Sequence, residues 1–395
     1  MSAELERRLR RAFDRLPEPG RDVSARTRST ALAAIPRAER RRAAWPFVLV
    51  AAAAAVVGLT AAALAATGNL HVDLGGRSSP APRVPTRLVV PAGTNGIAVV
   101  AGGKLWLATR RGLRIEGMPV STAELSPRGL FAAVGIGLSL VALAPGQRRA
   151  WTHDAGGRIV AIAWSPDGLK IAYVTRGSRG AALHMIEGDG DNDRLLDPRV
   201  AAEKPSWRAD SLAIAYVRPA GLATVYDLGS GRRRSFDTRR CGGRARAVAY
   251  APGRPRLAVA GGSGVALVER WNTRPTCVAF DRVLSISGLA WAGPRRIVTS
   301  DNPRPGIGAD SALRWYDAGR HGIESSRTAF TPRLLRTVTS SPRSHAVAVV
   351  IRRGPRELDL AVAVGSRGAR MSRLNGIRPL LRLRVPPAPV SISWR

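Results

Sequence analysis

Histidine, cysteine and lysine are scarce in this chain of 395 residues, and each shortage narrows the functions that the protein can have. The five histidines stand apart, and none has the spacing of a metal-binding H-E-x-x-H motif. The sequence also has no G-x-S-x-G nucleophile motif and no phosphate-binding Gly-Lys loop. We therefore expect no catalytic activity, no cofactor and no bound metal, and a binding function instead.

Acidic residues are few as well: 28 Asp and Glu stand against 62 Lys and Arg, which gives a net charge of +34. A charge of this size is typical of proteins that bind nucleic acid. However, the basic residues are nearly all arginines spread along the chain, since lysine occurs only at 104, 170 and 204. Together with abundant Ala and Gly, this resembles the codon bias of a GC-rich genome. We therefore do not expect nucleic acid as a partner.

One long stretch, from Ala43 to Val72, has no Asp, Glu, Lys or Arg. Its centre, residues 46–67, supplies the roughly 20 apolar residues that a helix needs to cross a bilayer. Four arginines between residues 37 and 42 precede it, and no Arg or Lys follows until Arg77. The positive-inside rule then predicts a single-pass cell-membrane protein with a cytoplasmic N-terminus and an extracytoplasmic remainder. Cleavage as a signal peptide after Ala63-Leu64-Ala65 is the alternative.

The segments on either side of this run, residues 1–45 and 68–87, differ in composition. Leu5, Leu9 and Leu16 fall at helical spacing, which predicts a short helical cytoplasmic segment. Short helices are unstable alone, so residues 1–42 are a frayed tail, a docking peptide for a cytoplasmic protein or a membrane-surface helix. Residues 68–87 are rich in Pro, Gly and Ser and are expected to form a stalk.

A repeated unit of about 40 residues fills residues 88–395, which is the length of a four-stranded propeller blade. Its clearest copy is Ala163–Val174, AWSPDGLKIAYV, in which an apolar strand ends in an aromatic residue and a Pro-Asp-Gly turn leads to a second strand. We expect the aromatic residue to fill the wedge between neighbouring blades. It recurs as Trp164, Trp207, Tyr250, Trp291 and Trp394.

The W-S-P-D-G…I-A-Y unit resembles the TolB-type propeller repeat, a relative of the WD repeat. The resemblance implies an all-β propeller that binds proteins or ligands, and it implies no reaction. Spacing predicts about seven four-stranded blades. Three strands over residues 97–115 have no inner strand before them, so the C-terminal strand Val390–Trp394 is expected to complete that blade and close the ring.

Two further patterns are an acidic segment that could bind a metal ion and a pair of cysteines that could form a disulfide. Glu187–Asp193 resembles the start of a calcium loop, but Val200 stands where a bidentate Glu is needed, so we expect a turn. Cys241 precedes the inner strand of the fifth unit and Cys277 lies in its outer strand. In an extracytoplasmic domain such a pair is often a disulfide, and two buried thiols are the alternative.

The loops that lead into each blade share one face with those between its second and third strands. The longest of the latter is Ser300–Ser311, and long loops in compact domains are often functional. Asp301, Asn302, Arg304 and Asp310 therefore form a candidate binding loop, with a mobile insertion as the alternative.

These patterns favour a membrane-anchored propeller that acts as a non-catalytic binding platform for an envelope protein, a peptide or a glycan. The alternative is signal transduction: the propeller senses an external ligand, and residues 1–42 hold or release a cytoplasmic regulator, as in a membrane-bound anti-sigma protein. The zinc-binding His/Cys motif of many anti-sigma domains is absent from the sequence. A third hypothesis is a purely structural envelope scaffold.

Overall fold

The computed structural model describes most of the chain from residue 96 onwards. The described residues are 96–109, 112–116, 119–129, 131–144, 149–269, 275–279, 284–304, 310–319, 322–340, 346–364, 380–386 and 390–394. The predicted cytoplasmic segment (1–45), membrane helix (46–67) and stalk (68–87) lie outside them. Within the described ranges, no helix has the length and apolar character needed to span a membrane.

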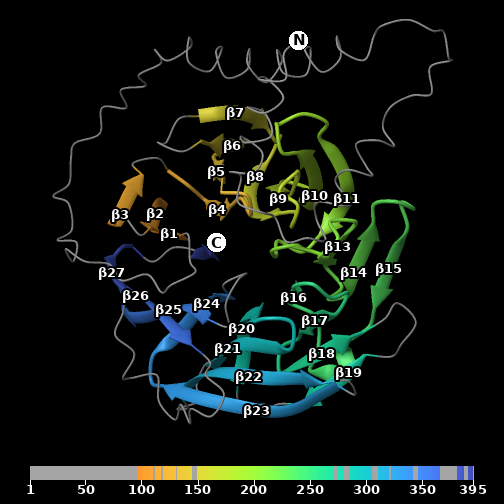
Figure 1. Ribbon diagram of the computed structural model, residues 1–395, viewed down its shortest axis with the longest axis vertical. Helices are drawn as coiled ribbons and strands as arrows, with labels where there is room; N and C mark the ends of the chain where they lie inside the picture. The colour runs from red at the N-terminus through yellow and green to blue at the C-terminus, as the bar shows by residue number, and fades with distance from the viewer. Residues whose placement is uncertain are drawn as a thin grey trace, which may run out of the picture. The chain divides into compact units, whose positions relative to one another are not determined.

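Seven four-stranded antiparallel sheets surround a central axis as the blades of a propeller (Figure 1). From the innermost strand outwards, blade 1 holds β28 (Ser391–Trp394), β1 (Ile97–Ala101), β2 (Lys104–Thr109) and β3 (Gly112–Glu116), and blade 2 holds β4 (Thr122–Leu125), β5 (Ala132–Ile136), β6 (Ser139–Leu143) and β7 (Arg149–Asp154). Blade 3 holds β8 (Arg158–Trp164), β9 (Lys170–Gly177), β10 (Gly180–Glu187) and β11 (Arg194–Val200), and blade 4 holds β12 (Ser206–Trp207), β13 (Ala213–Val217), β14 (Ala223–Asp227) and β15 (Arg233–Phe236).

The remaining three blades follow the same order. Blade 5 holds β16 (Ala247–Tyr250), β17 (Leu257–Ala260), β18 (Gly264–Val268) and β19 (Thr276–Ala279), and blade 6 holds β20 (Leu284–Trp291), β21 (Arg296–Pro303), β22 (Ser311–Gly319) and β23 (Gly322–Thr331). Blade 7 holds β24 (Leu334–Ser340), β25 (Ala346–Gly354), β26 (Glu357–Val364) and β27 (Leu381–Arg384). A short 3-10 turn, η1 (Arg239–Cys241), precedes blade 5. The prediction of about seven four-stranded blades is confirmed.

The ring closes through the C-terminal strand, as the sequence predicts. β28 pairs with β1 in antiparallel register, with Trp394 opposite Ile97. The last strand of the chain therefore forms the inner edge of the first blade, and both ends of the ring are held by backbone hydrogen bonds. Because closure joins the last blade to the first, it leaves fewer sheet edges exposed to solvent.

The hydrophobic core is divided among the boundaries between blades. The described buried apolar side chains form seven clusters, and each cluster combines residues of two neighbouring blades. Strands such as β1 (IAVVA) and β13 (AIAYV) are buried along their whole length, which explains their continuous apolar sequence. Each blade is thus stabilised mainly by the two blades that flank it.

The predicted wedge aromatics lie at these boundaries. Each of three tryptophans donates its indole N–H to a backbone carbonyl of the preceding blade's inner strand: Trp164 to Glu124 (3.2 Å), Trp207 to Ala163 (2.9 Å) and Trp291 to Ala249 (2.8 Å). Tyr250 is half-buried, and Trp394 is buried. Each bond adds a directional link to the apolar contact between two blades.

At two boundaries, the position equivalent to the wedge tryptophan is Tyr250 or Leu125, and a serine hydroxyl of the preceding blade joins the two blades. The hydroxyl of Ser206 accepts the backbone N–H of Tyr250 (2.9 Å), and that of Ser393 accepts the backbone N–H of Leu125 (3.1 Å). Each serine directly precedes the wedge residue of its own strand. The repeat therefore uses an indole donor at some boundaries and a serine acceptor at others.

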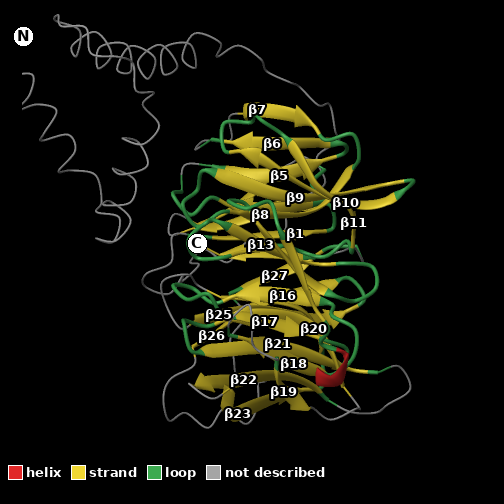
Figure 2. Ribbon diagram, turned by 90° about the vertical axis from the view of Figure 1, so that its right-hand side faces the viewer, coloured by secondary structure: helices red, strands yellow, loops and turns green. Residues whose placement is uncertain are grey.

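Alternating strand direction divides the connections between two faces. The loops between first and second strands, and between third and fourth strands, open on one side, which we call the bottom face. The loops between second and third strands, and those leading into the next blade, open on the opposite side, the top face. Figure 2 shows the strands running between loops at the two faces.

Candidate functional surface

Exposed basic side chains gather on the top face. They come from loops and strand ends of six blades that are far apart in the sequence: Lys104, Arg158, Arg176, Arg179, Lys204, Arg239, Arg240, Arg244, Arg246, Arg304, Arg333, Arg353, Arg356 and Arg384. The exposed carboxylates described on this face are Asp154, Glu203, Asp237 and Asp310. The bottom face is more mixed, since exposed Asp189, Asp191, Asp193 and Asp210 lie among arginines such as Arg232, Arg254 and Arg295.

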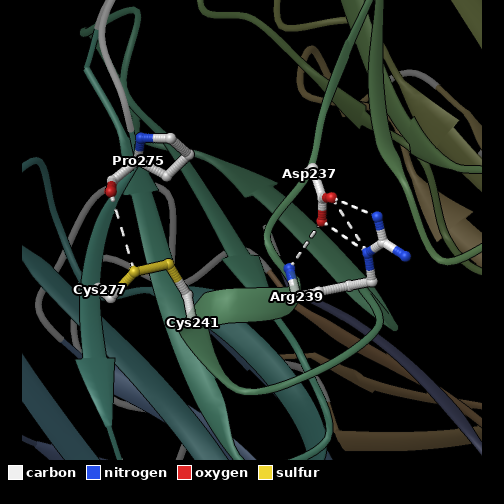
Figure 3. Close-up of a disulfide and its surroundings, with 5 residues drawn as sticks. All are labelled: Asp237, Arg239, Cys241, Pro275 and Cys277. Carbon is white, nitrogen blue, oxygen red and sulfur yellow. Dashed lines mark hydrogen bonds and ion pairs between the residues drawn. A yellow bond between two sulfur atoms is a disulfide. The ribbon is translucent and has the colours of Figure 1, made fainter.

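One top-face loop carries four of these arginines and is cross-linked. It runs from Asp237 to Arg246, between β15 and β16, and we call it the stapled loop. A disulfide joins Cys241 in η1 to Cys277 in β19, with the two Cα atoms 4.8 Å apart (Figure 3). The structure thus shows the disulfide, of the two alternatives that the sequence left open. Since Cys241 is buried between blades 4 and 5, the cross-link fixes the loop to the body of the propeller.

The first turn of the stapled loop is held by an ion pair. The Asp237 carboxylate accepts the backbone N–H of Arg239 (3.0 Å), and the Arg239 guanidinium donates to both of its oxygens (Figure 3). The side-chain hydrogen bond from Arg239, with the backbone bond as the next cause, lowers the pKa of Asp237 to about 2. Asp237 is therefore ionised at neutral pH.

Close backbone contacts hold the rest of the stapled loop. The carbonyl of Gly242 accepts the N–H of Ser263 (2.9 Å), and the N–H of Ala245 donates to the carbonyl of Gly221 (2.9 Å). Gly242 has a φ of +112°, and a Cβ there would lie 2.2 Å from the backbone nitrogen of Gly264. The stapled loop thus lies directly against the top-face loops of blades 4 and 5.

Charged side chains also cross between blades near the inner strands. Lys204, in the loop leading into blade 4, forms an ion pair with Glu124 of β4, whose side chain is only 18% exposed. Burial raises the pKa of Glu124, and Lys204 and a hydrogen bond from Ser393 oppose that shift. These contacts connect the loop before blade 4 to blades 1 and 2.

The neighbouring Glu203 links the stapled loop to blade 3. Desolvation raises the pKa of Glu203, whereas Arg246 of the stapled loop and Arg176 at the end of β9 act in the opposite direction. Arg246 also donates to the hydroxyl of Ser285 in β20 (3.1 Å). The arginines of two separate top-face loops are therefore electrostatically connected through one carboxylate.

The predicted candidate binding loop is only partly a loop. Asp301 and Asn302 lie within β21, which continues to Pro303, so the prediction that they belong to an exposed loop is wrong. Asp301 is 2% exposed and pairs with Arg314 (3.2 Å). The Asn302 amide donates to the carbonyl of Leu335 (2.6 Å) and accepts its N–H (2.7 Å), which links blades 6 and 7.

Arg304 and Asp310, the other two residues of that prediction, are exposed on the top face at either end of residues 305–309, which lie outside the described ranges. They retain a position suited to contact with a partner. Asp301 and Asn302 do not have such a position, because their side chains bond to Arg314 and Leu335 within the propeller.

The acidic segment Glu187–Asp193 forms the hairpin turn between β10 and β11. Its Asp189 side chain accepts the N–H of Asp191 (3.1 Å), and the carbonyl of Asp191 accepts the N–H of Glu187 (2.9 Å). In the part of the chain that the structure describes, no group of three His, Cys, Asp or Glu residues has an arrangement that could hold a metal ion. The segment is a turn here, in agreement with the sequence-based expectation.

Sequence reasoning missed one polar cluster at the boundary between blades 2 and 3. Asp193 accepts the hydroxyl of Tyr173 (2.7 Å), and its other oxygen lies 3.3 Å from His184 Nδ1 and 3.7 Å from His153 Nε2. The two histidines lie on β10 and β7, so no spacing in the sequence indicates that they meet. Burial and the Asp193 hydrogen bond raise the pKa of Tyr173, which keeps its hydroxyl a donor.

Compared with known proteins, the chain matches no protein family and no curated sequence. Its fold resembles that of a functionally unknown protein from Desulfotomaculum acetoxidans (TM-score 0.55, 10% identity, 76% of this chain and 99% of that one). It also resembles the WD40 repeats of RRP9 (0.52, 11%, 73% and 84%) and the C-terminal WD40 domain of Sif2 (0.50, 14%, 68% and 78%). At these identities the likeness shows the fold alone, a WD40-like seven-bladed propeller.

Proposed function

We propose that this protein is a membrane-anchored, extracytoplasmic propeller that binds an envelope protein, a peptide or a glycan without catalysing a reaction. The membrane anchor is the apolar run 46–67, with the arginines before it on the cytoplasmic side. The W-S-P-D-G repeat supports a relationship to TolB-type propellers in particular.

The observation that carries this proposal is the disulfide between Cys241 and Cys277. Disulfides persist in oxidising compartments and are rare in the cytosol, so the cross-link favours an extracytoplasmic propeller. The top face beside it is exposed and charged, whereas the boundary between blades 4 and 5 beneath it is filled by apolar side chains. The top-face loops are therefore a surface available to a partner.

A second candidate function rests on the N-terminal sequence. Leu5, Leu9 and Leu16 lie on one face of a short amphipathic pattern directly before the membrane run. In this hypothesis residues 1–42 hold a cytoplasmic regulator, in the manner of an anti-sigma protein, and the propeller senses an external ligand.

A crosslinking pull-down from intact membranes tests both functions, with the full chain and a version lacking residues 1–42 as matched baits. If both baits capture the same envelope protein, the platform is supported. A cytoplasmic regulator captured by the full chain alone favours the transducer. Capture of nothing extracytoplasmic by either bait contradicts the platform.

A further inference from the structure

Five exposed arginines lie on and beside the stapled loop, and we call them the basic patch: Arg176, Arg179, Arg240, Arg244 and Arg246. The last three belong to the stapled loop, and the first two lie where β9 turns into β10. Both groups open on the top face, since one lies between the second and third strands of blade 3 and the other leads into blade 5. Glu203, in the top-face loop that leads into blade 4, interacts electrostatically with Arg176 and with Arg246. Blades 3 and 5 thus both contribute to the cationic top face.

The stapled loop holds its part of this surface in a fixed position. The Cys241–Cys277 disulfide, the Gly242–Ser263 hydrogen bond and the Ala245–Gly221 hydrogen bond restrain it along its length. A loop that is ordered before binding loses less conformational entropy when a partner docks. An exposed loop held at so many points, with four arginines among its ten residues from 237 to 246, suits a preorganised recognition surface.

We propose that the basic patch is the docking surface for an acidic segment of a partner protein. The inference rests on the proposed function and names the chemistry of the partner. Arginine guanidinium groups present a planar fork that matches a carboxylate with two parallel hydrogen bonds. The Arg239–Asp237 pair on the same loop shows this match within the protein itself, since Nε donates to Oδ1 and Nη2 donates to Oδ2.

Two observations favour a protein segment over nucleic acid. Glu203 lies among the arginines of the top face, and a carboxylate there repels a phosphate backbone, which is charged at every nucleotide, more than a protein segment whose acidic residues alternate with neutral or basic ones. Stacking on aromatic side chains is the usual support for single-stranded bases. Among the described residues, the exposed large hydrophobic side chains are five leucines and Phe330. Phe330 lies on β23 of blade 6, whereas the arginines of the basic patch come from blade 3 and the loop between blades 4 and 5.

The test uses the full chain in non-ionic detergent and fluorescence anisotropy. The probe is a labelled peptide of alternating Glu and Ser, and its control is the same peptide with Gln in place of Glu. The triple variant Arg240→Glu, Arg244→Glu, Arg246→Glu reverses three charges of the basic patch. Its matched control, Arg232→Glu, Arg254→Glu, Arg295→Glu, reverses three exposed charges on the bottom face.

We expect the Glu peptide to bind the natural chain, with an affinity that falls as salt is added, and the Gln peptide not to bind. The top-face triple should weaken binding by about tenfold or more, and the bottom-face triple by less than about twofold. Arg176→Glu with Arg179→Glu, outside the stapled loop, should also weaken binding, and this pair decides the question if the triple variant does not fold.

Equal loss in both triple variants would mean that the peptide senses net charge only, and the docking surface would be rejected. A DNA oligonucleotide or a phosphatidylglycerol vesicle that binds through the basic patch while the Glu peptide does not would also overturn it. If an envelope protein is crosslinked equally well by the natural chain and by the top-face triple, the platform function stands and the docking surface does not.

Discussion

The indole nitrogen of Trp207 in blade 4 donates a hydrogen bond to the backbone carbonyl of Ala163 in blade 3, 2.9 Å away. Ala163 directly precedes Trp164, which makes the same kind of bond to Glu124 of blade 2. The wedge residue of blade 4 is therefore hydrogen-bonded to the residue that directly precedes the wedge residue of blade 3. The chain of contacts makes blades depend on their neighbours, and a change at one boundary should affect the whole ring.

Truncation of a wedge residue should destabilise the propeller severely. Trp207 is 6% exposed, so Trp207→Ala removes a buried aromatic ring and should lower the free energy of unfolding by about 3–5 kcal/mol. Trp207→Phe retains most of the ring and loses the hydrogen bond, which should cost about 1–2 kcal/mol. Urea denaturation followed by circular dichroism measures both. Leu212→Ala, at a side chain that is 54% exposed, is the control and should change little.

The disulfide should contribute to stability and to the order of the stapled loop. Cys241 and Cys277 are 36 residues apart in the sequence, and a cross-link closing a loop of this size stabilises by about 2–4 kcal/mol. Replacing both cysteines with Ser should lower the unfolding midpoint by a corresponding amount, measured by thermal denaturation with and without a reducing agent. The reducing agent should have no effect on the double variant. If iodoacetamide labels both thiols of the native, unreduced protein, the disulfide is absent.

Asp301 should make stability depend on pH in a specific window. Desolvation raises its pKa to about 6, and Arg314 only partly opposes the shift. The unfolded carboxyl has a pKa of about 3.9, so the folded state holds the proton more tightly. The protonated Asp301 carboxyl therefore stabilises the folded state fully below about pH 4, and this stabilisation is lost as the pH rises to about 6. The change in the free energy of unfolding is on the order of 2–3 kcal/mol.

Urea denaturation at a series of pH values between 4 and 7 measures this dependence. Asp301→Asn cannot titrate, so the fall in stability across that window should be smaller in the variant than in the natural chain. Identical pH profiles for the two proteins would show that Asp301 does not carry a raised pKa.

The sequence predicted the fold because the fold depends on local patterns. The turn at Ser165–Gly168 and the apolar strands around it form within one repeat, and their spacing fixes the size of a blade. The closing strand could also be predicted, since three strands at the start of the ring lacked an inner partner. These inferences need only strand periodicity and turn chemistry.

The surface could be predicted only in part, because it is assembled from separate blades. Arginines that are spread along the sequence meet on the top face, since alternating strand direction brings every second loop to the same side. The inward position of Asp301 depends on Arg314, one strand away, and the position of Asn302 depends on Leu335 of the next blade. The bond between Cys241 and Cys277 likewise depends on the three-dimensional distance between their Cα atoms, which the sequence does not contain.

Glycine at position 242 should be required for the stapled loop to adopt its position. Gly242 and Gly253 both have positive φ, at +112° and +70°, so Ala is strained at either site. A Cβ at 242 would also meet the backbone of Gly264 at 2.2 Å, whereas nothing lies within 4 Å of one at 253. Gly253→Ala should therefore cost about 1–2 kcal/mol, and Gly242→Ala at least about 3 kcal/mol, in the free energy of unfolding. Because the extra cost arises from displacing the stapled loop, Gly242→Ala should also weaken binding of the Glu peptide, and Gly253→Ala should not. Equal effects of the two variants on both measurements would show that the close approach of Gly242 to Gly264 does not hold the loop in place.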